Sequence, residues 1–386
     1  MKFVFHVSPN IKDRLSTQNI MWQLTAGLMV IFVLACIYYG SSYGVNYAIQ
    51  AVVLLLCSLV STLACEAIFA KCMKQKPMDF IKNSFGWVTA IILTLMVPIN
   101  IKPFALIVAS ICCIVLSKLL FGGFGNNIFN PAAVGRAIIF ASFMGASTDL
   151  VTSATPTAML ASAYNWLPAN SAVLDSFLSQ FGGFTSLALG TYPGAIGETF
   201  SIAIILVGIY LAFKQVIDWR VPVTYLGTIF VLTSLVAMLT GIDAYHGVPG
   251  FIWYPMLHLL TGGVIFGGVF MLTDPVTSPT SASGRVIFAL GAGVLTTLIR
   301  LKANLPEGCL YSILLMNLFT PMIENALDGK QLDIKKKVYT LLTCIALVGI
   351  GVSFYAASSI EPVTEVVDEK TALVEVQESM NQEAAL

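Results

Sequence analysis

Val45–Ala70 reads V-N-Y-A-I-Q-A-V-V-L-L-L-C-S-L-V-S-T-L-A-C-E-A-I-F-A, and Glu66 is the one charged residue in this apolar stretch. A helix rises about 1.5 Å per residue, so roughly 20 residues cross the hydrocarbon core of a bilayer. The stretch is long enough to be a membrane-spanning helix. It predicts a chain that folds within a membrane.

Similar apolar runs recur along the chain. Of its 386 residues, 57% are hydrophobic and 10% are charged, against about 25% charged in an average soluble domain. We predict an all-α polytopic membrane protein with about 10–11 transmembrane helices. The eleven predicted spans are Ile20–Tyr39, Val45–Ala70, Gly86–Asn100, Pro103–Phe121, Pro131–Ala146, Thr199–Phe213, Val223–Thr240, Tyr254–Leu272, Gly284–Leu301, Gly308–Leu327 and Val338–Ala357. The third and fifth are short, so we expect them to be tilted, broken or paired as half-helices.

The distribution of Lys and Arg predicts the orientation of the spans. With the N-terminus in the cytoplasm, sixteen of the 20 basic residues lie inside, and only Lys102, Arg300, Lys302 and Lys370 lie outside. Cytoplasmic loops carry an excess of Lys and Arg, so this orientation is favoured. It places residues 145–198, which contain no Lys or Arg, on the exterior side. The net charge of zero gives no reason to expect a nucleic-acid partner.

Two polar segments rich in Gly and Pro interrupt the apolar pattern on the predicted cytoplasmic side. They read F-G-G-F-G-N-N-I-F-N-P-A-A-V-G-R-A at Phe121–Ala137 and G-G-V-F-M-L-T-D-P-V-T-S-P-T-S-A-S-G-R at Gly267–Arg285. Each contains an Asn-Pro or Asp-Pro pair and a Gly-Arg pair before an apolar run, which suggests an internal repeat. Irregular backbone at membrane depth persists only where protein or a cavity satisfies its polar groups. We therefore expect the two segments to contact each other or a ligand.

These segments contain the first candidate site residues. Asn127 and Asn130 supply amide donors and acceptors suited to a planar heterocycle. Asp274 is an acid flanked by apolar sequence, and an unpaired charge at the centre of a membrane helix costs about 2.5–3.5 kcal/mol or more. Two interpretations of Asp274 are open. It is a helix cap or an ion-pair partner of Arg136 or Arg285, or it belongs to a buried cofactor or ion site between the segments.

Four further side chains are weaker candidates. Glu66 and Glu324 lie near the inner ends of their spans, and we expect interfacial anchoring, with an ion pathway as the alternative. His258 is expected to be hydrogen-bonded inside the bundle, and Trp166 to cover apolar surface rather than stack on a planar cofactor. The eight cysteines form no C-x-x-C pair, so an iron–sulfur cluster held by this chain alone is not expected.

A short motif lies in the exterior segment. Asp149–Thr155 reads D-L-V-T-S-A-T and matches the pattern D-x-x-[ST]-[GS]-A-T. Thr155 offers a hydroxyl that a phosphate can esterify, while the small Ser153 and Ala154 leave room for a modifying enzyme. Pro156 disfavours the α conformation for the residue before it, so we expect Thr155 to be extended with its side chain outward. The motif predicts covalent attachment of a cofactor after export.

With this motif, the chain resembles the flavinylated, D-type membrane subunits of Rnf-type ion-translocating electron-transport complexes. It also resembles the homologous B-type subunits of Na⁺-translocating NADH:quinone reductase. The G-x-G-N-N-x-F-N-P-A segment at Gly123–Ala132 and T-D-P-V at Thr273–Val276 are similar to that family, and the resemblance covers roughly residues 1–337. It implies a urea-transporter-like bundle built from repeated halves.

The resemblance also implies two flavins. A flavin transferase would use FAD to link FMN to Thr155 through a phosphoester, and Asp149 would help it to engage the motif. A second, non-covalent riboflavin would bind at the Asn-rich and T-D-P-V segments. The implied cofactor-binding residues are Thr155, Asp149, Ser153, Ala154, Asn127, Asn130 and Asp274.

The implied function is that of an electron carrier in a ferredoxin:NAD⁺ oxidoreductase complex that translocates Na⁺ or H⁺ across the cell membrane, with Thr155 on the exterior side. Its partners would be other membrane and peripheral subunits, including a second covalent flavoprotein subunit (G-type) and iron–sulfur subunits. The short segment before the first span, residues 1–19, favours the D-type subunits. The alternatives are the B-type subunit of the quinone reductase, or a urea-transporter-like channel without a redox function.

These expectations divide the chain into a first membrane half at 1–144, the exterior segment at 145–198 and a second membrane half at 199–329. A basic cytoplasmic segment with an additional transmembrane helix follows at 330–357. An acidic exterior tail at 358–386 has the composition of a disordered segment. Members of the resembled family tend to end soon after the tenth span, so the eleventh is a departure. It leaves the contacts of the C-terminus open.

Overall fold

The computed structural model describes residues 16–143, 155–192, 194–303, 308–360 and 362–363. Asp149, Ser153 and Ala154 lie outside these described residues, as does most of the acidic tail. The described chain consists of helices and turns, with isolated β-bridges and no strand. The prediction of an all-α polytopic protein is confirmed.

The first half of the bundle contains α1 (Thr17–Ser42), α2 (Val45–Cys72), α3 (Pro77–Ser84), α4 (Gly86–Leu95), α5 (Pro103–Ile114), the π-helical turn η1 (Val115–Leu119) and α6 (Pro131–Ser142). The sequence specifies several of the starts. Pro occupies the first turn of α3, α5 and α6, where its missing N–H costs nothing. The Ser16 side chain caps α1 by accepting a hydrogen bond from the Asn19 N–H.

The segment expected as an exterior loop contains α7 (Pro156–Ser162), α8 (Ser171–Phe181) and α9 (Gly183–Leu189). In α8, the apolar residues Val173, Leu174, Phe177 and Leu178 are buried, at the spacing of one helix face. The segment is therefore packed against the bundle. Its helices are too short to stand out in the sequence from the surrounding Gly, Ser and Thr.

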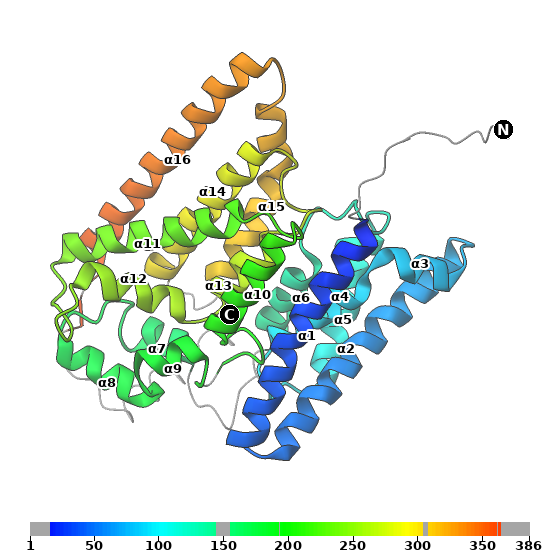
Figure 1. The fold of residues 1–386 in the computed structure, drawn as a ribbon, viewed down its shortest axis with the longest axis horizontal. Helices are drawn as coiled ribbons and strands as arrows, with labels where there is room; N and C mark the ends of the chain where they lie inside the picture. Colours follow the sequence, from blue (N-terminus) through cyan, green and yellow to red (C-terminus); the bar gives the residue numbers. More distant parts are fainter. Residues whose placement is uncertain (1–15, 144–154, 193, 304–307, 361, 364–386) are drawn as a thin grey trace.

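The second half contains α10 (Ser201–Phe213), α11 (Arg220–Thr240), α12 (Gly250–Leu260), α13 (Val264–Phe266), the π-helical turn η3 (Gly267–Met271), α14 (Ala282–Lys302) and α15 (Gly308–Ala326). The chain continues with α16 (Gln331–Ser359), which packs against α11 and α14 (Figure 1). This helix is the expected additional span.

Five of the described helices, α1, α2, α11, α14 and α16, are long and apolar enough to cross a membrane. Shorter apolar helices include α4, α5 with η1, α6 and α10, which agrees with the short third and fifth spans. The span predicted at Tyr254–Leu272 is bent, because α12 and the α13–η3 segment meet at an angle of 74°. The break falls at Thr261–Gly263, where Gly262 has a φ of 69°.

The packing of the two halves is repeated. In the first half, α2 packs against α1, α4 and α5, and α5 packs against α6. In the second, α11 packs against α12 and α14, and α14 against α15. With the five spans predicted before it, the second set would run in the opposite direction, as in an inverted repeat. The two halves lie side by side in Figure 1.

This arrangement corrects the pairing on which the suspected repeat rested. The segment 121–137 connects η1 to α6, whereas 267–285 connects η3 to α14. In the repeated packing, these connections are not equivalent, because α6 corresponds to α15 and α14 corresponds to α5. The similar Gly-Arg sequences therefore do not mark the repeat.

Candidate functional site

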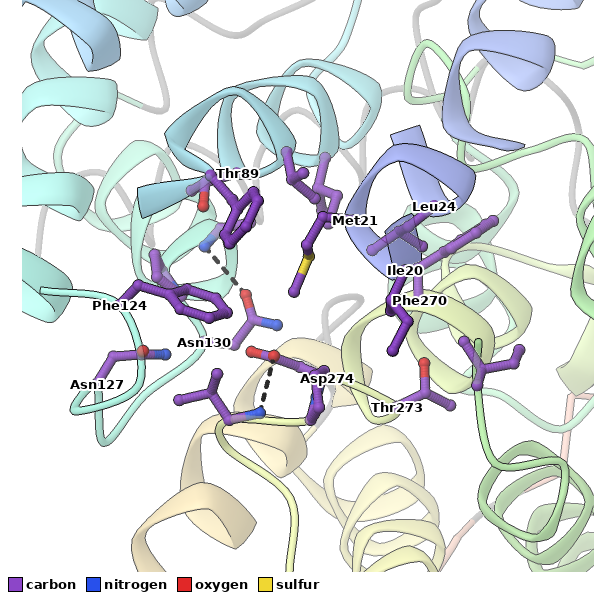
Figure 2. Close-up of a pocket in the computed structure, with 18 of the residues that line it drawn as sticks. Ile20, Met21, Leu24, Thr89, Phe124, Asn127, Asn130, Phe270, Thr273 and Asp274 are labelled. Carbon is purple, nitrogen blue, oxygen red and sulfur yellow. Dashed lines mark hydrogen bonds between the residues drawn. The ribbon is translucent and has the colours of Figure 1, made fainter. Parts of the chain in front are cut away.

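A cavity lies between the two halves, near the first turns of α1. Its walls come from α1 (Ile20, Met21, Leu24), from α4 and from the two Gly/Pro-rich segments. Asn127, Asn130 and Asp274 all line it, although Asp274 is far from the asparagines in sequence. Figure 2 shows Asn130 and Asp274 as neighbours in this cavity. The expectation that the two segments contact each other is confirmed.

Asn130 joins the two segments. Its Oδ1 accepts hydrogen bonds from the N–H groups of Ala132 (3.0 Å) and Ala133 (3.4 Å), which caps α6. Its Nδ2 donates to the Met271 carbonyl oxygen at 3.4 Å, at the end of η3. The side chain is buried, and the protein provides hydrogen-bond partners for both the oxygen and the nitrogen of its amide. Asn130 therefore fixes the geometry of the cavity, rather than presenting a free amide to it.

Asp274 is stabilised locally. Its Oδ1 accepts from the Val276 N–H at 3.2 Å, and its Oδ2 accepts from the Thr277 hydroxyl at 3.2 Å. Burial raises the pKa of the Asp274 carboxyl, and these two donors and the Lys118 ammonium act in the opposite direction. The expected ion pair with Arg285 is wrong, because Arg285 Nη1 lies 3.0 Å from Asp218 Oδ2. Asp274 therefore caps the turn that follows it, in keeping with the capping interpretation, and it also faces the cavity.

The apolar walls of the cavity and the amide of Asn127 are suited in kind to a planar heterocycle. Phe85, Val88, Phe124 and Phe270 provide apolar walls, while Asn127 contributes an amide whose Nδ2 makes one weak bond, at 3.4 Å, to the Phe129 carbonyl. The free volume is about 60 Å³, below the roughly 300–1,000 Å³ of typical small-molecule sites. A tricyclic ligand would need more space than this cavity has.

Additional space lies next to the first cavity. A second cavity of about 400 Å³ shares Ile20, Val216, Ile217, Thr273 and Pro275 with the first. Its remaining lining is more polar and includes the Asp218–Arg285 ion pair. Together, the two cavities offer an apolar end and a polar end. This combination suits a ligand with a flat ring system and a hydrophilic side chain.

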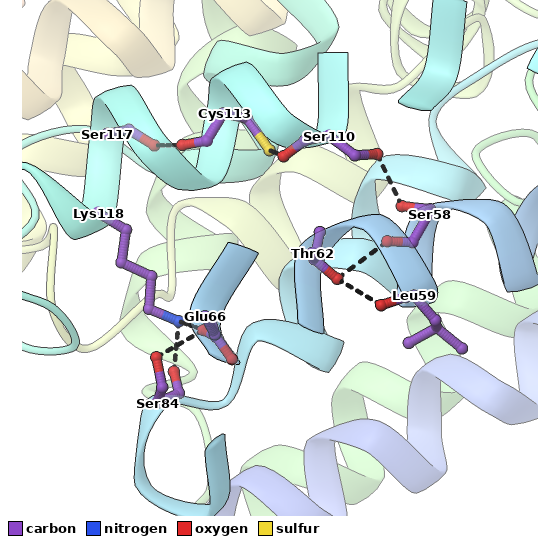
Figure 3. Close-up of polar contacts among 9 residues, drawn as sticks. All are labelled: Ser58, Leu59, Thr62, Glu66, Ser84, Ser110, Cys113, Ser117 and Lys118. Atoms are coloured by element: carbon purple, nitrogen blue, oxygen red, sulfur yellow. Dashed lines mark hydrogen bonds and ion pairs between the residues drawn. The ribbon is translucent and has the colours of Figure 1, made fainter. Parts of the chain in front are cut away.

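Beside the first cavity lies a buried ion pair that is not among the sequence-based candidates. Lys118 lines the cavity, and its Nζ lies 3.0 Å from Glu66 Oε1 and also donates to the Ser84 carbonyl oxygen (Figure 3). The Ser84 hydroxyl donates to Glu66 Oε1 at 2.5 Å. Glu66 is fully buried, so interfacial anchoring is wrong for this residue. Glu324, by contrast, is exposed and accepts from Thr280, in keeping with an anchor.

Thr155 does not line this cavity and lies at the start of α7. It caps α7, with φ −76° and ψ 151°, and its Oγ1 accepts from the Ala158 N–H at 3.2 Å. The extended backbone expected before Pro156 is confirmed. The Thr155 side chain is partly exposed, whereas Thr157, whose Oγ1 lies 3.2 Å away, is buried. Of these two hydroxyls, Thr155 is the accessible one.

The segment that contains α7–α9 is attached to the bundle through Trp166. The indole is buried and stacks on His258, with ring centroids 5.5 Å apart. The Arg300 guanidinium lies 5.2 Å from the indole centroid and donates to the carbonyls of His258 (2.6 Å) and Thr261 (3.0 Å). The expectation that Trp166 covers apolar surface holds only in part, because its ring faces an imidazole and a cation.

The sequence contains only weak signals for Lys118 and Arg300. Lys118 is the one charge in the apolar run from Pro103 to Phe121, and a lone charge in such a run marks a buried partner. Arg300 stands near the end of its span, so the charge distribution assigns it to the exterior surface. Only the fold shows that both are almost completely buried.

Comparison with known proteins defines the class. Residues 4–333 match the NQR2, RnfD, RnfE family, and the chain belongs to this family. It is 36% identical, over 333 residues, to the D-type subunit of the proton-translocating ferredoxin:NAD(+) oxidoreductase complex of Clostridium ljungdahlii, covering 83% of this chain and 93% of that protein. The Na(+)-translocating counterpart of Acetobacterium woodii is 36% identical, over 82% of this chain and 91% of the length of that protein. The D-type subunit of the ion-translocating oxidoreductase complex of Pseudomonas paraeruginosa is 32% identical, over 82% of this chain and 92% of the length of that protein.

Proposed function

We propose that this chain is the flavin-carrying, D-type membrane subunit of an ion-translocating ferredoxin:NAD⁺ oxidoreductase complex, which couples electron transfer to the movement of Na⁺ or H⁺. The observation that carries the proposal is the cavity in which Asn127, Asn130 and Asp274 meet. The names of the curated relatives support the same activity. The second flavin of the proposal is a riboflavin bound without a covalent link at this cavity.

Bound flavin would supply the electron-transfer chemistry, and the protein binds, orients and shields it. The apolar walls exclude water, and Asn130 holds the Asn-rich segment against η3. Lys118 lines the cavity with its charge balanced by Glu66, so the pair brings no net charge to a ligand there. Asn127 is the residue that presents amide groups to the ligand.

The first flavin of the proposal is FMN, joined through its phosphate to Thr155. The partly exposed Thr155 hydroxyl is accessible to a flavin transferase, and extended backbone presents it. A phosphoester replaces the hydroxyl hydrogen but leaves the oxygen able to accept from the Ala158 N–H. Attachment is therefore compatible with the cap of α7.

The two proposed sites lie apart in the fold, one at the cavity lined by Ile20 and the other at the start of α7. Ile20 lines the cavity, and the Tyr39 hydroxyl donates to the Gly194 carbonyl oxygen in the exterior segment. The twenty helical residues from Ile20 to Tyr39 span about 28 Å, close to the thickness of a bilayer core. We therefore propose that centres in partner subunits, including a G-type flavoprotein and iron–sulfur proteins, relay electrons between them. The proposed location is the cell membrane, with Thr155 on the exterior side.

The deciding experiment measures flavin fluorescence of the denatured polypeptide in a gel, after expression with its flavin transferase. The native chain should fluoresce, and Thr155→Ala should not, although it should still insert into the membrane. Thr155→Ser keeps a hydroxyl at the same position and should retain fluorescence. Mass spectrometry of the peptide containing residues 149–157 should place the FMN-sized adduct on Thr155.

The same experiment separates the alternatives. A urea-transporter-like channel would carry no covalent flavin, so a dark native band from cells with active transferase refutes the proposal. The B-type subunit of the quinone reductase would be fluorescent as well. The assembled complex distinguishes that case, because ferredoxin-dependent NAD⁺ reduction is expected here and quinone reduction by NADH is not.

A further inference from the structure

The C-terminal helix lies beyond the region shared with the family. The family match ends at residue 333, and α16 runs from Gln331 to Ser359. The curated relatives are covered over 91–93% of their own length but over only 82–83% of this chain. In Figure 1, α16 lies at the periphery, outside α11 and α14. The contacts of α16 with the rest of the chain therefore indicate its role.

The helix is attached at its C-terminal part. A Cβ placed on Gly349 would lie 3.0 Å from Val294 Cγ2 and 3.3 Å from Leu232 Cδ2, so the glycine permits close approach to α14 and α11. One turn later, the Ser353 hydroxyl donates to the Leu232 carbonyl oxygen at 3.1 Å. Ala356 is fully buried. A glycine and small residues at an interface of this kind let membrane helices pack tightly.

The end of α16 is also held. Lys302, the last residue of α14, donates from Nζ to the Ser359 carbonyl oxygen at 3.3 Å. The same ammonium lies 4.9 Å from the centroid of the Tyr355 ring. Ile360, which follows the helix, is 7% exposed. These contacts direct the chain after α16 toward the exterior segment.

Val363 then pairs with that segment as a short parallel bridge. Its N–H donates to the Leu167 carbonyl oxygen at 3.1 Å, and its carbonyl oxygen accepts from the Ala169 N–H at 3.2 Å. The Ala169 carbonyl oxygen in turn accepts from the Asp243 N–H at 3.3 Å. The backbone at 167–169 is therefore held between the C-terminal segment and the turn after α11.

The paired backbone leads directly to Thr155. Trp166, beside Leu167, donates its N–H to the Leu160 carbonyl oxygen of α7, and the Leu167 N–H donates to that of Tyr164. The Tyr254 hydroxyl donates to the Trp166 carbonyl oxygen at 2.9 Å. Because Thr155 caps α7, a fixed position for residues 160–169 also fixes Thr155.

We propose that α16 and Val363 form a strap that positions the exterior segment from Thr155 to Ala169 on the bundle. What that segment carries rests on the proposed function, since the covalent flavin would be held by the same contacts. The strap is a feature of this chain, beyond the part that matches the family. Its predicted effect is to hold Thr155 in a constant position while partner subunits exchange electrons with its cofactor.

The test compares Gly349→Leu with Gly351→Leu in the full-length protein within the assembled complex. Both changes add the same side chain to α16, but a Cβ at Gly351 meets nothing within 4 Å, whereas one at Gly349 meets α11 and α14. A second variant, Val363→Pro, removes the N–H that binds Leu167, and Val363→Ala retains it. Amide hydrogen exchange at Ala169 is the first readout, and in-gel covalent flavin is the second.

Gly349→Leu and Val363→Pro should each speed exchange at Ala169 about tenfold or more, as expected from losing a few hydrogen bonds. Covalent flavin per polypeptide should stay constant, while the rate of its reduction in the complex falls. Gly351→Leu and Val363→Ala should match the native protein in all three measurements. Since Val363→Pro leaves the α16 interface intact, it keeps the test valid if Gly349→Leu fails to fold.

Unchanged exchange at Ala169 in both test variants would overturn the strap, whatever the flavin content. Faster exchange with an unchanged rate of flavin reduction would overturn its positioning role. Faster exchange in a chain whose native form carries no covalent flavin would leave the strap standing as an anchor of the segment. That last result would instead refute the proposed function.

Discussion

Lys118 and Glu66 carry opposite charges into the interior of the first half. Their contact is 3.0 Å long, and Glu66 Oε2 has no hydrogen-bond partner among the described residues. Removing two charges from water is costly, and mutual attraction offsets that cost only when both partners are present. The pair is therefore more sensitive to loss of one member than to loss of both.

We predict that Lys118→Met destabilises the protein by about 3–5 kcal/mol, because it leaves a buried carboxylate without a counter-ion. The double variant Lys118→Met/Glu66→Gln should recover most of this loss. Thermal unfolding in one detergent, with all variants at the same concentration, measures the difference. Equal or additive losses in the double variant would show that the two side chains do not act as a pair.

Asn130 acts through structure at the cavity, whereas Asn127 is placed to contact a ligand. Asn130→Leu removes the cap of α6 and the bond to Met271, so we predict loss of acid-extractable riboflavin and a lower unfolding temperature. Asn127→Leu should lose riboflavin with less change in stability, since Asn127 caps no helix and its Nδ2 bonds a carbonyl only two residues away, at Phe129. Covalent FMN should be unaffected in both. Full riboflavin in both variants, and in Asp274→Leu, would contradict the site.

At the scale of elements, glycine sets how closely helices approach. A Cβ on Gly86, the first residue of α4, would overlap the Glu66 carboxylate. The absence of a side chain at this position is therefore required for the buried carboxylate to lie between α2 and α4. The broken segment of α12 and α13 depends on a similar arrangement, because a Cβ on Gly262 would lie 2.6 Å from Thr157 Cγ2.

Gly86→Ala should therefore destabilise the first half by about 1–3 kcal/mol, because the added methyl group forces Glu66 or α4 to move. Gly227→Ala in α11 is the matched control, since a Cβ there meets nothing within 4 Å. Alanine favours a helix interior by about 0.8–1.0 kcal/mol over glycine, so the control should be neutral or stabilising. Thermal unfolding again measures both. A neutral Gly86→Ala would mean that Glu66 has room to turn away.

At the scale of the whole molecule, the two halves pack in a repeated manner on either side of the cavity, and α7–α9 lie beside the second half, where α9 packs against α10 and α12 (Figure 1). The arrangement places the cavity between the two halves and Thr155 outside it, at the start of α7. The orientation of the chain in the membrane then decides which site faces the cytoplasm and which faces the exterior. The distribution of Lys and Arg predicts that α7–α9 are outside.

Cysteine labelling tests this orientation. Ala172, in α8, is exposed, so Ala172→Cys should react with an impermeant thiol reagent in intact cells. Lys82→Cys, at the exposed surface of α3, should react only after the cells are permeabilised. Cys72 and Cys344 are exposed and should be replaced beforehand. The reverse labelling pattern would invert the predicted topology.

The sequence alone determined the class of this protein, because spans in a membrane must be long and apolar, and the eleven predicted runs each coincide with a helix or a pair of helices. Local chemistry likewise predicted the extended Thr155 before Pro156, whereas for Asp274 it left capping and a cofactor site open. Only the tertiary structure decided which residues meet. The Lys118–Glu66 pair, the Trp166–Arg300 contact and the Val363 bridge each join distant segments. A buried charge in the sequence indicates that a partner is needed, but the packing of helices determines which residue that partner is.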